Sequence, residues 1–235
     1  MTRVIVEDGG TSMKTADDAI RRAIIEDYRV LGEAPEADLQ GLVQLAATVC
    51  GVPTAVINLI DDRFQHQIAA VGIEPAVCSR EDSMCAVVFR KPGHTVVTDA
   101  SLDERFAGNP FVTGEVANVK FYASSPLITP MGVPIGTICI FDEVPRELPE
   151  DESAALALIA RQIVDVLELR RITRELGESN EQLENFAAQV AHDLRNPLTA
   201  LTGYIELAAD VPEVAGLPAA SRALARAESV ADRMS

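Results

Sequence analysis

A long stretch with an apolar residue at every third or fourth position most constrains how this 235-residue chain can fold. The stretch runs from about Glu150 to Asp210, and its spacing matches one face of an α-helix. Three acidic residues, 150–152, stand at its start, where they interact favourably with a helix dipole. We therefore expect one long helix, and the chain divides near residue 150.

The apolar face of this predicted helix has two sections that differ in phase by one residue around Leu169–Arg171. The first section contains Leu156, Ile159, Ile163 and Val166, and the second contains Ile172, Leu176, Leu183, Phe186 and Val190. The second section fits heptads of a parallel two-stranded coiled coil. Either one coiled-coil seam rotates at the phase change, or the first section packs on a preceding domain and only the second forms the coil. Arg170 and Arg171 are expected on a solvated face.

A histidine stands on the polar face of the same helical pattern. With Leu194 at the centre of the apolar face, His192 and Asn196 each lie roughly 200° around the helix, at about 100° per residue. Both side chains are therefore expected to be exposed. Pro197 has no N–H to donate to the Asp193 carbonyl, and a proline inside a helix costs about 3 kcal/mol. It predicts a bend one turn after the histidine.

This segment resembles the H-box of sensor histidine kinases, in which a histidine and an acid precede Asn or Thr, Pro and an apolar residue. The matching residues are His192, Asp193, Asn196, Pro197 and Leu198. The resemblance implies that His192 attacks the γ-phosphoryl group of ATP and that Asp193 orients the imidazole and accepts its proton. It implies that Asn196 positions a water for dephosphorylation of a response regulator. Arg195 is either a phosphate contact or a solvated charge.

Composition favours an intracellular signalling protein. The net charge of −16 argues against nucleic acid or an anionic membrane as a partner. The N-terminus lacks the basic and apolar regions of a signal peptide, and no apolar run is long enough to span a bilayer. We therefore expect a cytoplasmic protein.

The first 150 residues predict an α+β domain. We expect a disordered start over 1–13 and two helical segments within 14–51, the second ending at Gly51. Strands are expected over 54–60, 64–71, 95–98, 120–128 and 135–141, with a short helix from Asp82, as its cap, to Arg90. The clearest hairpin turn is 129–132. Helices bracketing such a meander indicate an antiparallel sheet flanked by helices.

Three phrases in this region resemble a GAF domain, a small sensory module of bacterial kinases and cyclases. They are 99–106 followed by Asn109-Pro110, then 120–127, then 136–142. The resemblance implies a sensor domain over 14–149, with a ligand pocket on one side of its sheet and a ligand that the sequence does not identify. Neither His66 nor His94 follows a cysteine, which argues against a bilin. A haem ligand is possible in principle, but a surface or hydrogen-bonded histidine is the commoner outcome.

Four cysteines provide a second set of candidate residues. Cys78, Cys85 and Cys139 are candidates for redox sensing, because Cys139 and the helix carrying Cys85 could both border the GAF pocket. Their spacing matches no standard zinc or iron–sulfur site, and Cys50 and Cys139 have the apolar neighbours of buried free cysteines. A structural role is the alternative. Cys78, in a polar segment, is expected to be the most exposed and reactive.

The C-terminal region predicts half of a four-helix dimer bundle. After a turn over 211–218, a second amphipathic helix is expected over 219–235. We assign 150–181 to a signalling coiled coil and 182–235 to an incomplete dimerisation and phosphotransfer domain. A glycine-rich ATP lid is not found, so ATP and Mg²⁺ are expected on a separate catalytic domain. The chain alone is then expected to be inactive as a kinase.

Together these features predict the sensor and phosphoacceptor portion of a dimeric two-component histidine kinase. His192 would take a phosphoryl group from ATP and pass it to an aspartate on the receiver domain of a response regulator, under control of the GAF domain. Two alternatives remain at this point: a non-catalytic dimeric docking module, and a thiol-based redox or metal sensor. A GAF-type peroxide or sulfoxide reductase is more remote, because the sequence shows no paired resolving cysteine.

Overall fold

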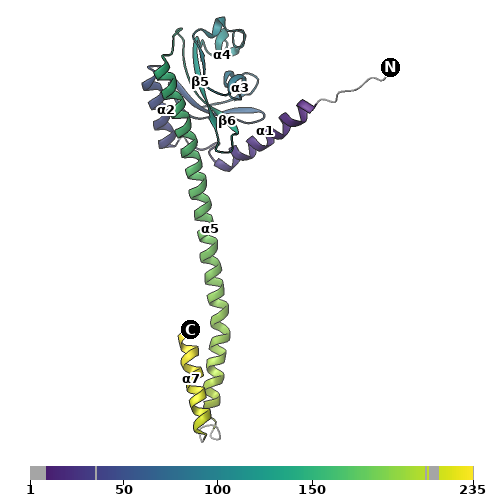
Figure 1. The fold of residues 1–235 in the computed structure, drawn as a ribbon, viewed down its shortest axis with the longest axis vertical. Coiled ribbons are helices and arrows are strands. Elements are labelled where there is room, and N and C mark those ends of the chain that lie inside the picture. Colours follow the sequence, from purple (N-terminus) through teal and green to yellow (C-terminus); the bar gives the residue numbers. More distant parts are fainter. Residues whose placement is uncertain (1–8, 35, 210, 212–216, 235) are drawn as a thin grey trace, which may run out of the picture. The chain divides into compact units, whose positions relative to one another are not determined.

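A computed structural model describes residues 9–34, 36–209, 211 and 217–234 (Figure 1). The chain divides into two compact units, one ending at Ile172 and the other beginning at Thr173. Helix α5 (Glu150–Ala209) belongs to both units, and its bounds agree with the predicted long helix to within one residue. Among the described residues, no helix is long and apolar enough to cross a membrane.

The first unit is built on a six-stranded antiparallel sheet with the strand order β3-β2-β1-β6-β5-β4. The strands are β1 (Thr54–Ile60), β2 (Phe64–Val71), β3 (Val77–Ser79), β4 (Thr95–Val97), β5 (Phe121–Ile128) and β6 (Pro134–Asp142). The bounds predicted for β1 and β2 are confirmed to the residue. The three-residue strand β3, which pairs with β2 at the sheet edge, was not predicted, because it stands in a polar segment without an alternating pattern.

Helices cover both faces of the sheet (Figure 1). One face packs against α1 (Gly9–Tyr28), α2 (Ala37–Val49) and the first half of α5, and the other against α3 (Met84–Val88), the 3₁₀ turn η1 (Ala100–Leu102) and α4 (Pro110–Thr113). All seven residues of the central strand β1 are buried, which is the pattern of a strand covered on both faces. Alternate β1 residues therefore belong to two cores: Ile57 and Leu59 to one, Val56 and Ile60 to the other.

Two details of the N-terminal region differ from the sequence prediction. Helix α1 begins at Gly9, so residues 9–13, expected in a disordered start, are helical. Extending an existing helix is easier than starting one, because each added residue gains one hydrogen bond. Residues 1–8 lie outside the described residues. Helix α3 is capped by Ser83, whose hydroxyl accepts from the Ala86 N–H at 2.9 Å, and not by Asp82.

Glycines fix the geometry of β6 at two points. Gly132 has a φ of 79° and closes the predicted turn between β5 and β6, with its N–H donating to the Thr129 carbonyl at 2.8 Å. Gly136 lies against the Asn58 backbone, and a Cβ at this position would collide with the Asn58 carbonyl oxygen. The absence of a side chain at Gly136 lets β1 and β6 approach closely beside Asn58.

The second unit contains the rest of α5 and helix α7 (Pro218–Met234). The helix bounds predicted for this region are confirmed to within one residue among the described positions. Most of the predicted turn, 212–216, lies outside the described residues, as does residue 235.

Candidate functional site

His192 lies on the exposed surface of α5. Its side chain is 68% exposed and that of Asp193 is 61% exposed, and Asn196, one turn further along, is also exposed. The exposure predicted from helical geometry is confirmed for both His192 and Asn196. A side chain in this position can be reached by a second protein domain.

Asp193 is held in place beside the histidine ring. His192 Nδ1 lies 3.3 Å from Asp193 Oδ1, and Gln189 Nε2 donates to both carboxylate oxygens of Asp193 at 3.1 Å. Because Nδ1 faces the carboxylate, Nε2, across the ring, faces away from it. When Nδ1 carries the proton, Nε2 has the free lone pair of a nucleophile. Gln189, one turn before Asp193, was not singled out from the sequence, although the i, i+4 spacing indicates such a contact.

Helix α5 continues through Pro197. Two threonine hydroxyls just beyond the proline donate to carbonyls one turn earlier, Thr199 to Arg195 at 2.9 Å and Thr202 to Leu198 at 3.0 Å. Bonds of this kind often accompany bent helices. The bend itself stays a prediction.

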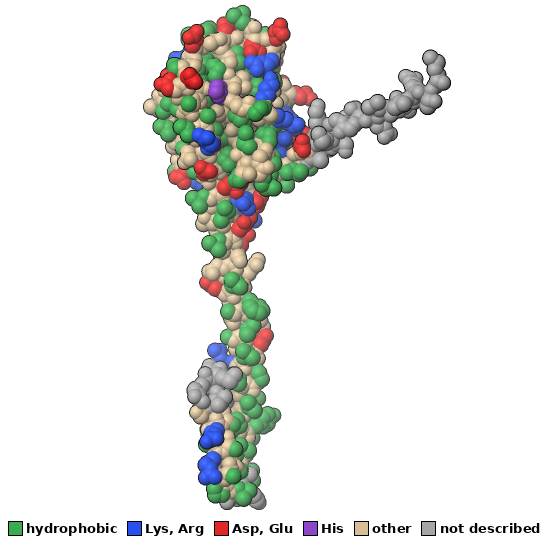
Figure 2. Space-filling model, viewed as in Figure 1, with side chains coloured by type: hydrophobic (Ala, Val, Ile, Leu, Met, Phe, Trp, Pro, Cys, Tyr) green, Lys and Arg blue, Asp and Glu red, His purple; other side chains and the backbone are tan. Residues whose placement is uncertain are grey.

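The apolar stripe of the second unit is exposed in the single chain. Leu194, expected at the centre of a buried face, is 55% exposed, and Phe186 and Leu183 are more exposed still. Hydrophobic side chains appear along this part of α5 in Figure 2. Ile205 is the exception, being 8% exposed. The expected burial is not seen in the single chain, and contiguous exposed apolar residues mark an interaction surface.

A second group of candidate residues lies in the sheet domain, around a small pocket on the α3 side. Cys85 and Cys139 line this pocket together with Asn58 and Tyr122. Asn58 Nδ2 donates to both sulfurs, at 3.2 Å to Cys139 and 3.6 Å to Cys85. The sequence prediction that these two cysteines could border one pocket is confirmed.

The other two cysteines are placed differently. Cys78 lies in β3 and is only partly exposed, and burial raises the pKa of its thiol to about 11. Cys78 is the most exposed of the four cysteines, as predicted. The raised pKa of its thiol does not favour the predicted reactivity, because pairing of β3 with β2 reduces its access to water. Cys50 is buried in the core that contains α2, and burial raises its pKa to about 11, with Glu152 adding to the shift.

The two histidines of the sheet domain are either hydrogen-bonded or exposed. His66 Nε2 lies 2.8 Å from Asp61 Oδ2, and His94 is exposed in the loop before β4. Within the described part of the chain, no group of three or more His, Cys, Asp or Glu is arranged to hold a metal ion.

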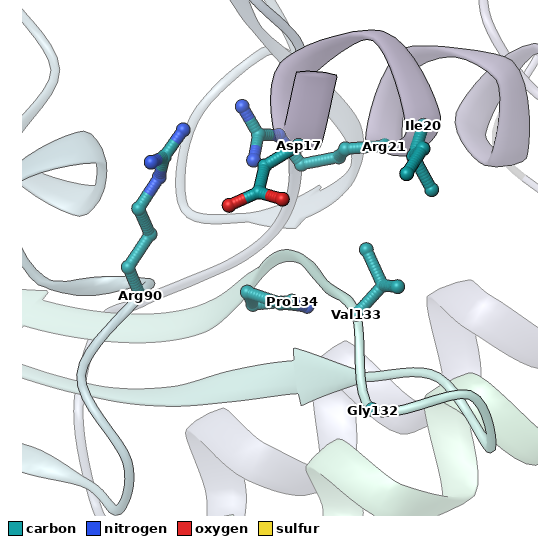
Figure 3. Close-up of a pocket in the computed structure, with 7 residues that line it drawn as sticks. All are labelled: Asp17, Ile20, Arg21, Arg90, Gly132, Val133 and Pro134. Atoms are coloured by element: carbon teal, nitrogen blue, oxygen red, sulfur yellow. The ribbon is translucent and has the colours of Figure 1, made fainter. Parts of the chain in front are cut away.

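A further pocket, of about 300 Å³, lies between α1 and the β5–β6 turn (Figure 3). Asp17, Ile20 and Arg21 reach it from α1, and Arg90 from the segment after α3. Arg21 Nε donates to the Ile60 carbonyl at 3.0 Å, and burial lowers the Arg21 pKa to about 10. These contacts identify Arg21 as a residue that fixes α1 to the end of β1.

Three guanidinium groups surround one aromatic ring beside this pocket. Arg21, Arg80 and Arg90 lie 5.0, 5.8 and 5.6 Å from the Phe89 ring centre, within the range of cation–π attraction. All three form ion pairs with Asp18. Asp18 therefore partly neutralises the three guanidinium groups, and the cluster joins α1 to the segments that follow β3 and α3.

Residues 182–235 match the model of the His Kinase A (phospho-acceptor) domain family. The chain is also 32% identical, over 163 residues, to a cyclic di-GMP phosphodiesterase of Pseudomonas aeruginosa. That match covers 69% of this chain but only 28% of the length of the phosphodiesterase.

The sheet domain is similar in fold to solved GAF domains. The GAF domain of a phosphoenolpyruvate-protein phosphotransferase from Coxiella burnetii superposes with a TM-score of 0.51, covering 68% of this chain and 96% of that one. The equivalent domain from Acinetobacter gives a TM-score of 0.50 over 68% and 98%. Each is 15% identical in sequence, so the likeness concerns the fold.

The α+β architecture and the GAF resemblance are thus confirmed, and the segment that contains His192 falls within the matched phosphoacceptor domain. This chain combines a GAF-fold domain with a segment that matches the phosphoacceptor domain family of histidine kinases.

Proposed function

We propose that His192 of this chain accepts the γ-phosphoryl group of ATP. The observation that carries the proposal is the exposed imidazole whose Nδ1 faces Asp193, inside the segment matched to the phosphoacceptor family. ATP and Mg²⁺ are brought by a histidine-kinase catalytic domain, and the residues of this chain supply the acceptor nitrogen and its orientation.

The transfer is a displacement at the γ-phosphorus of ATP. The Nε2 lone pair of His192 forms the new P–N bond, the bond from phosphorus to the bridging oxygen breaks, and ADP leaves with its electron pair. Positive charge develops on the imidazole, and the Asp193 carboxylate stabilises it through Nδ1–H and accepts the proton. Gln189 holds the carboxylate in position.

The phosphoryl group then passes to an aspartate on a response-regulator receiver domain. Asn196, exposed one turn after His192, is proposed to position water for the reverse reaction, dephosphorylation of the regulator. We also propose that a ligand bound to the GAF-fold domain controls the phosphorylation of His192 and the transfer to the regulator.

A homodimer is the proposed form of the protein. Members of the phosphoacceptor family generally form dimers, and the exposed stripe along the second half of α5 is apolar enough to require cover. A four-helix bundle made from two copies, each giving α5 and α7, would supply the opposing face.

The test supplies an isolated histidine-kinase catalytic domain and labelled ATP to this chain. Acid-labile, base-stable label is expected on the wild type and absent from His192→Gln. His66→Gln and His94→Gln are matched controls that retain the label. Without the catalytic domain, no label is expected on the chain.

Two further variants separate the roles of the neighbouring residues. Asp193→Asn is expected to slow labelling by roughly 100-fold, the lower end of what a positioned acid or base contributes, while the protein stays dimeric. Asn196→Ala is expected to retain labelling and to lose dephosphorylation of the regulator. A dimeric chain that takes no label from several catalytic domains would favour the docking-module alternative.

A further inference from the structure

The sheet domain brings together two thiols that are far apart in the sequence. Asn58 on β1, Cys139 on β6 and Tyr122 on β5 project from the same face of the sheet, because Asn58 pairs with Thr137 and Cys139 lies two residues further along β6. Helix α3 covers this face and places Cys85 over the other three side chains. Cys85 and Cys139 are 3% and 4% exposed.

We propose that Cys85 and Cys139 form a peroxide-reactive dithiol site, in which Cys85 is the attacking sulfur and Cys139 the resolving one. The proposal is independent of phosphorylation at His192. It rests on the shared hydrogen-bond donor of the two sulfurs, on the pocket beside them and on an unpartnered acceptor atom of Asn58, which lines that pocket.

Hydrogen bonds distinguish the two sulfurs. Cys85 Sγ accepts from the Tyr122 hydroxyl at 3.3 Å as well as from Asn58 Nδ2 at 3.6 Å, whereas Cys139 Sγ accepts from Asn58 Nδ2 at 3.2 Å. Contact with Cys139 lowers the pKa of the Cys85 thiol despite its burial, and the same contact raises the pKa of Cys139. Since the thiolate is the reactive form, the additional Tyr122 donor makes Cys85 the better nucleophile, and Cys139 is the resolving thiol.

The pocket limits the size of the oxidant. Its free volume is about 50 Å³, and a cavity needs roughly 10–15 Å³ to hold one water molecule. Hydrogen peroxide fits such a space, and a hydroperoxide with a bulky organic group does not. The Asn58 Oδ1 atom, buried without a hydrogen-bond partner within the described structure, can accept a hydrogen bond from a peroxide O–H.

The chemistry balances with one peroxide for two thiols. The Cys85 thiolate attacks one peroxide oxygen, an S–O bond forms, the O–O bond breaks, and hydroxide leaves and takes a proton to become water. Cys139 then attacks the sulfenic sulfur, an S–S bond forms, the S–O bond breaks, and a second water leaves. Hydrogen peroxide is reduced by two electrons and the two thiols are oxidised to one disulfide.

The test treats the reduced 235-residue chain with one equivalent of hydrogen peroxide. Two of the four thiols are expected to disappear, and peptide mass spectrometry is expected to find a Cys85–Cys139 disulfide. Cys85→Ser is expected to retain all of its remaining thiols. Cys139→Ser is expected to stop at a sulfenic acid on Cys85 that a dimedone probe traps. Cys50→Ser and Cys78→Ser are matched controls that still form the disulfide.

Two further measurements guard against variants that disturb folding. Tyr122→Phe removes one donor to Cys85 and is expected to slow oxidation roughly tenfold, because thiolate character sets the rate, with the same final disulfide. Cumene hydroperoxide, which is too large for the pocket, is expected to react with the native wild type more slowly than hydrogen peroxide. A Cys78–Cys85 disulfide, oxidation of Cys50 at the same rate, or no thiol loss in the folded wild type would each overturn the proposal.

Discussion

The two halves of α5 have the same apolar periodicity and opposite burial. In the first half, Leu156 and Ile163 are fully buried in the core between α2 and the sheet. In the second half, Leu176 is 69% exposed and Leu183 63% exposed. The phase change seen in the sequence at Leu169–Arg171 falls beside the boundary between the two units, at Ile172. An apolar stripe therefore predicts that one face of a helix packs against another surface, but it does not identify that surface.

The arginines at this boundary also differ from expectation. Arg170 pairs with Glu36 and Asp38 beside α2, and Arg171 pairs with Glu168 at 3.0 Å and with Asp27 of α1 at 3.8 Å. The predicted solvated face is therefore wrong at these two positions. Acidic residues of α1 and of the α2 segment lie close enough to pair with them, which the sequence of α5 alone does not show.

The largest expected effect comes from a charge in the second stripe. Leu194→Asp places an unpaired carboxylate in the proposed dimer seam, where burying it costs several kcal/mol. The dimer dissociation constant is expected to rise by roughly 100-fold or more, measured by analytical ultracentrifugation. Arg195→Asp, at the next position, is the control and should leave the dimer intact. Unchanged association of Leu194→Asp would mean that the stripe is not the interface.

A truncation in the first stripe is expected to act on the sheet domain instead. Ile163→Ala leaves a cavity in the core and should cost about 2–5 kcal/mol of unfolding free energy, measured by hydrogen exchange of the β1 amides in the full chain. Ile172→Ala, the same substitution nine residues further along the helix, should change that protection by about 0.5 kcal/mol or less. Equal effects of the two variants would remove the distinction between the halves.

The boundary ion pairs are expected to contribute less. Arg171→Ala removes the pairs with Glu168 and Asp27 and should cost about 0.5–1 kcal/mol, since partly exposed ion pairs are weak. The loss should shrink at high salt, because mobile ions screen the interaction. Arg195→Ala in the second half serves as the comparison, and a salt-independent loss in Arg171→Ala would point to packing instead of charge.

The smallest effect concerns acid stability of the sheet domain. Burial by itself would raise the Asp61 pKa, but hydrogen bonds from the Phe64 N–H and His66, with a further one from Arg63, bring it below the ordinary 3.8. A carboxylate with a depressed pKa stabilises the folded state above its ordinary pKa, and this contribution is lost as the pH falls below 3.8. Urea unfolding of Asp61→Asn should show a stability difference from wild type of less than about 1 kcal/mol at pH 6 that disappears near pH 2. A stability difference that persists near pH 2 would mean that the charge of the Asp61 carboxylate is not its cause.

Sequence alone was sufficient wherever the determining interactions are local. The bounds of α5, β1 and β2 follow from the spacing of apolar residues along the chain. The turn at Gly132 follows from a backbone conformation that glycine adopts without strain. Each of these depends on residues within a few positions of one another, so a single sequence contains all the information that is needed.

Tertiary structure decided everything that depends on which segments meet. Cys85 and Cys139 share Asn58 only because β6 lies between β1 and β5 and α3 crosses the same face. The partner of Arg171 depends on where α1 ends, and burial of Ile163 depends on α2. Local periodicity carries no record of strand order, since the free energy that selects one order comes from burying side chains contributed by distant parts of the chain.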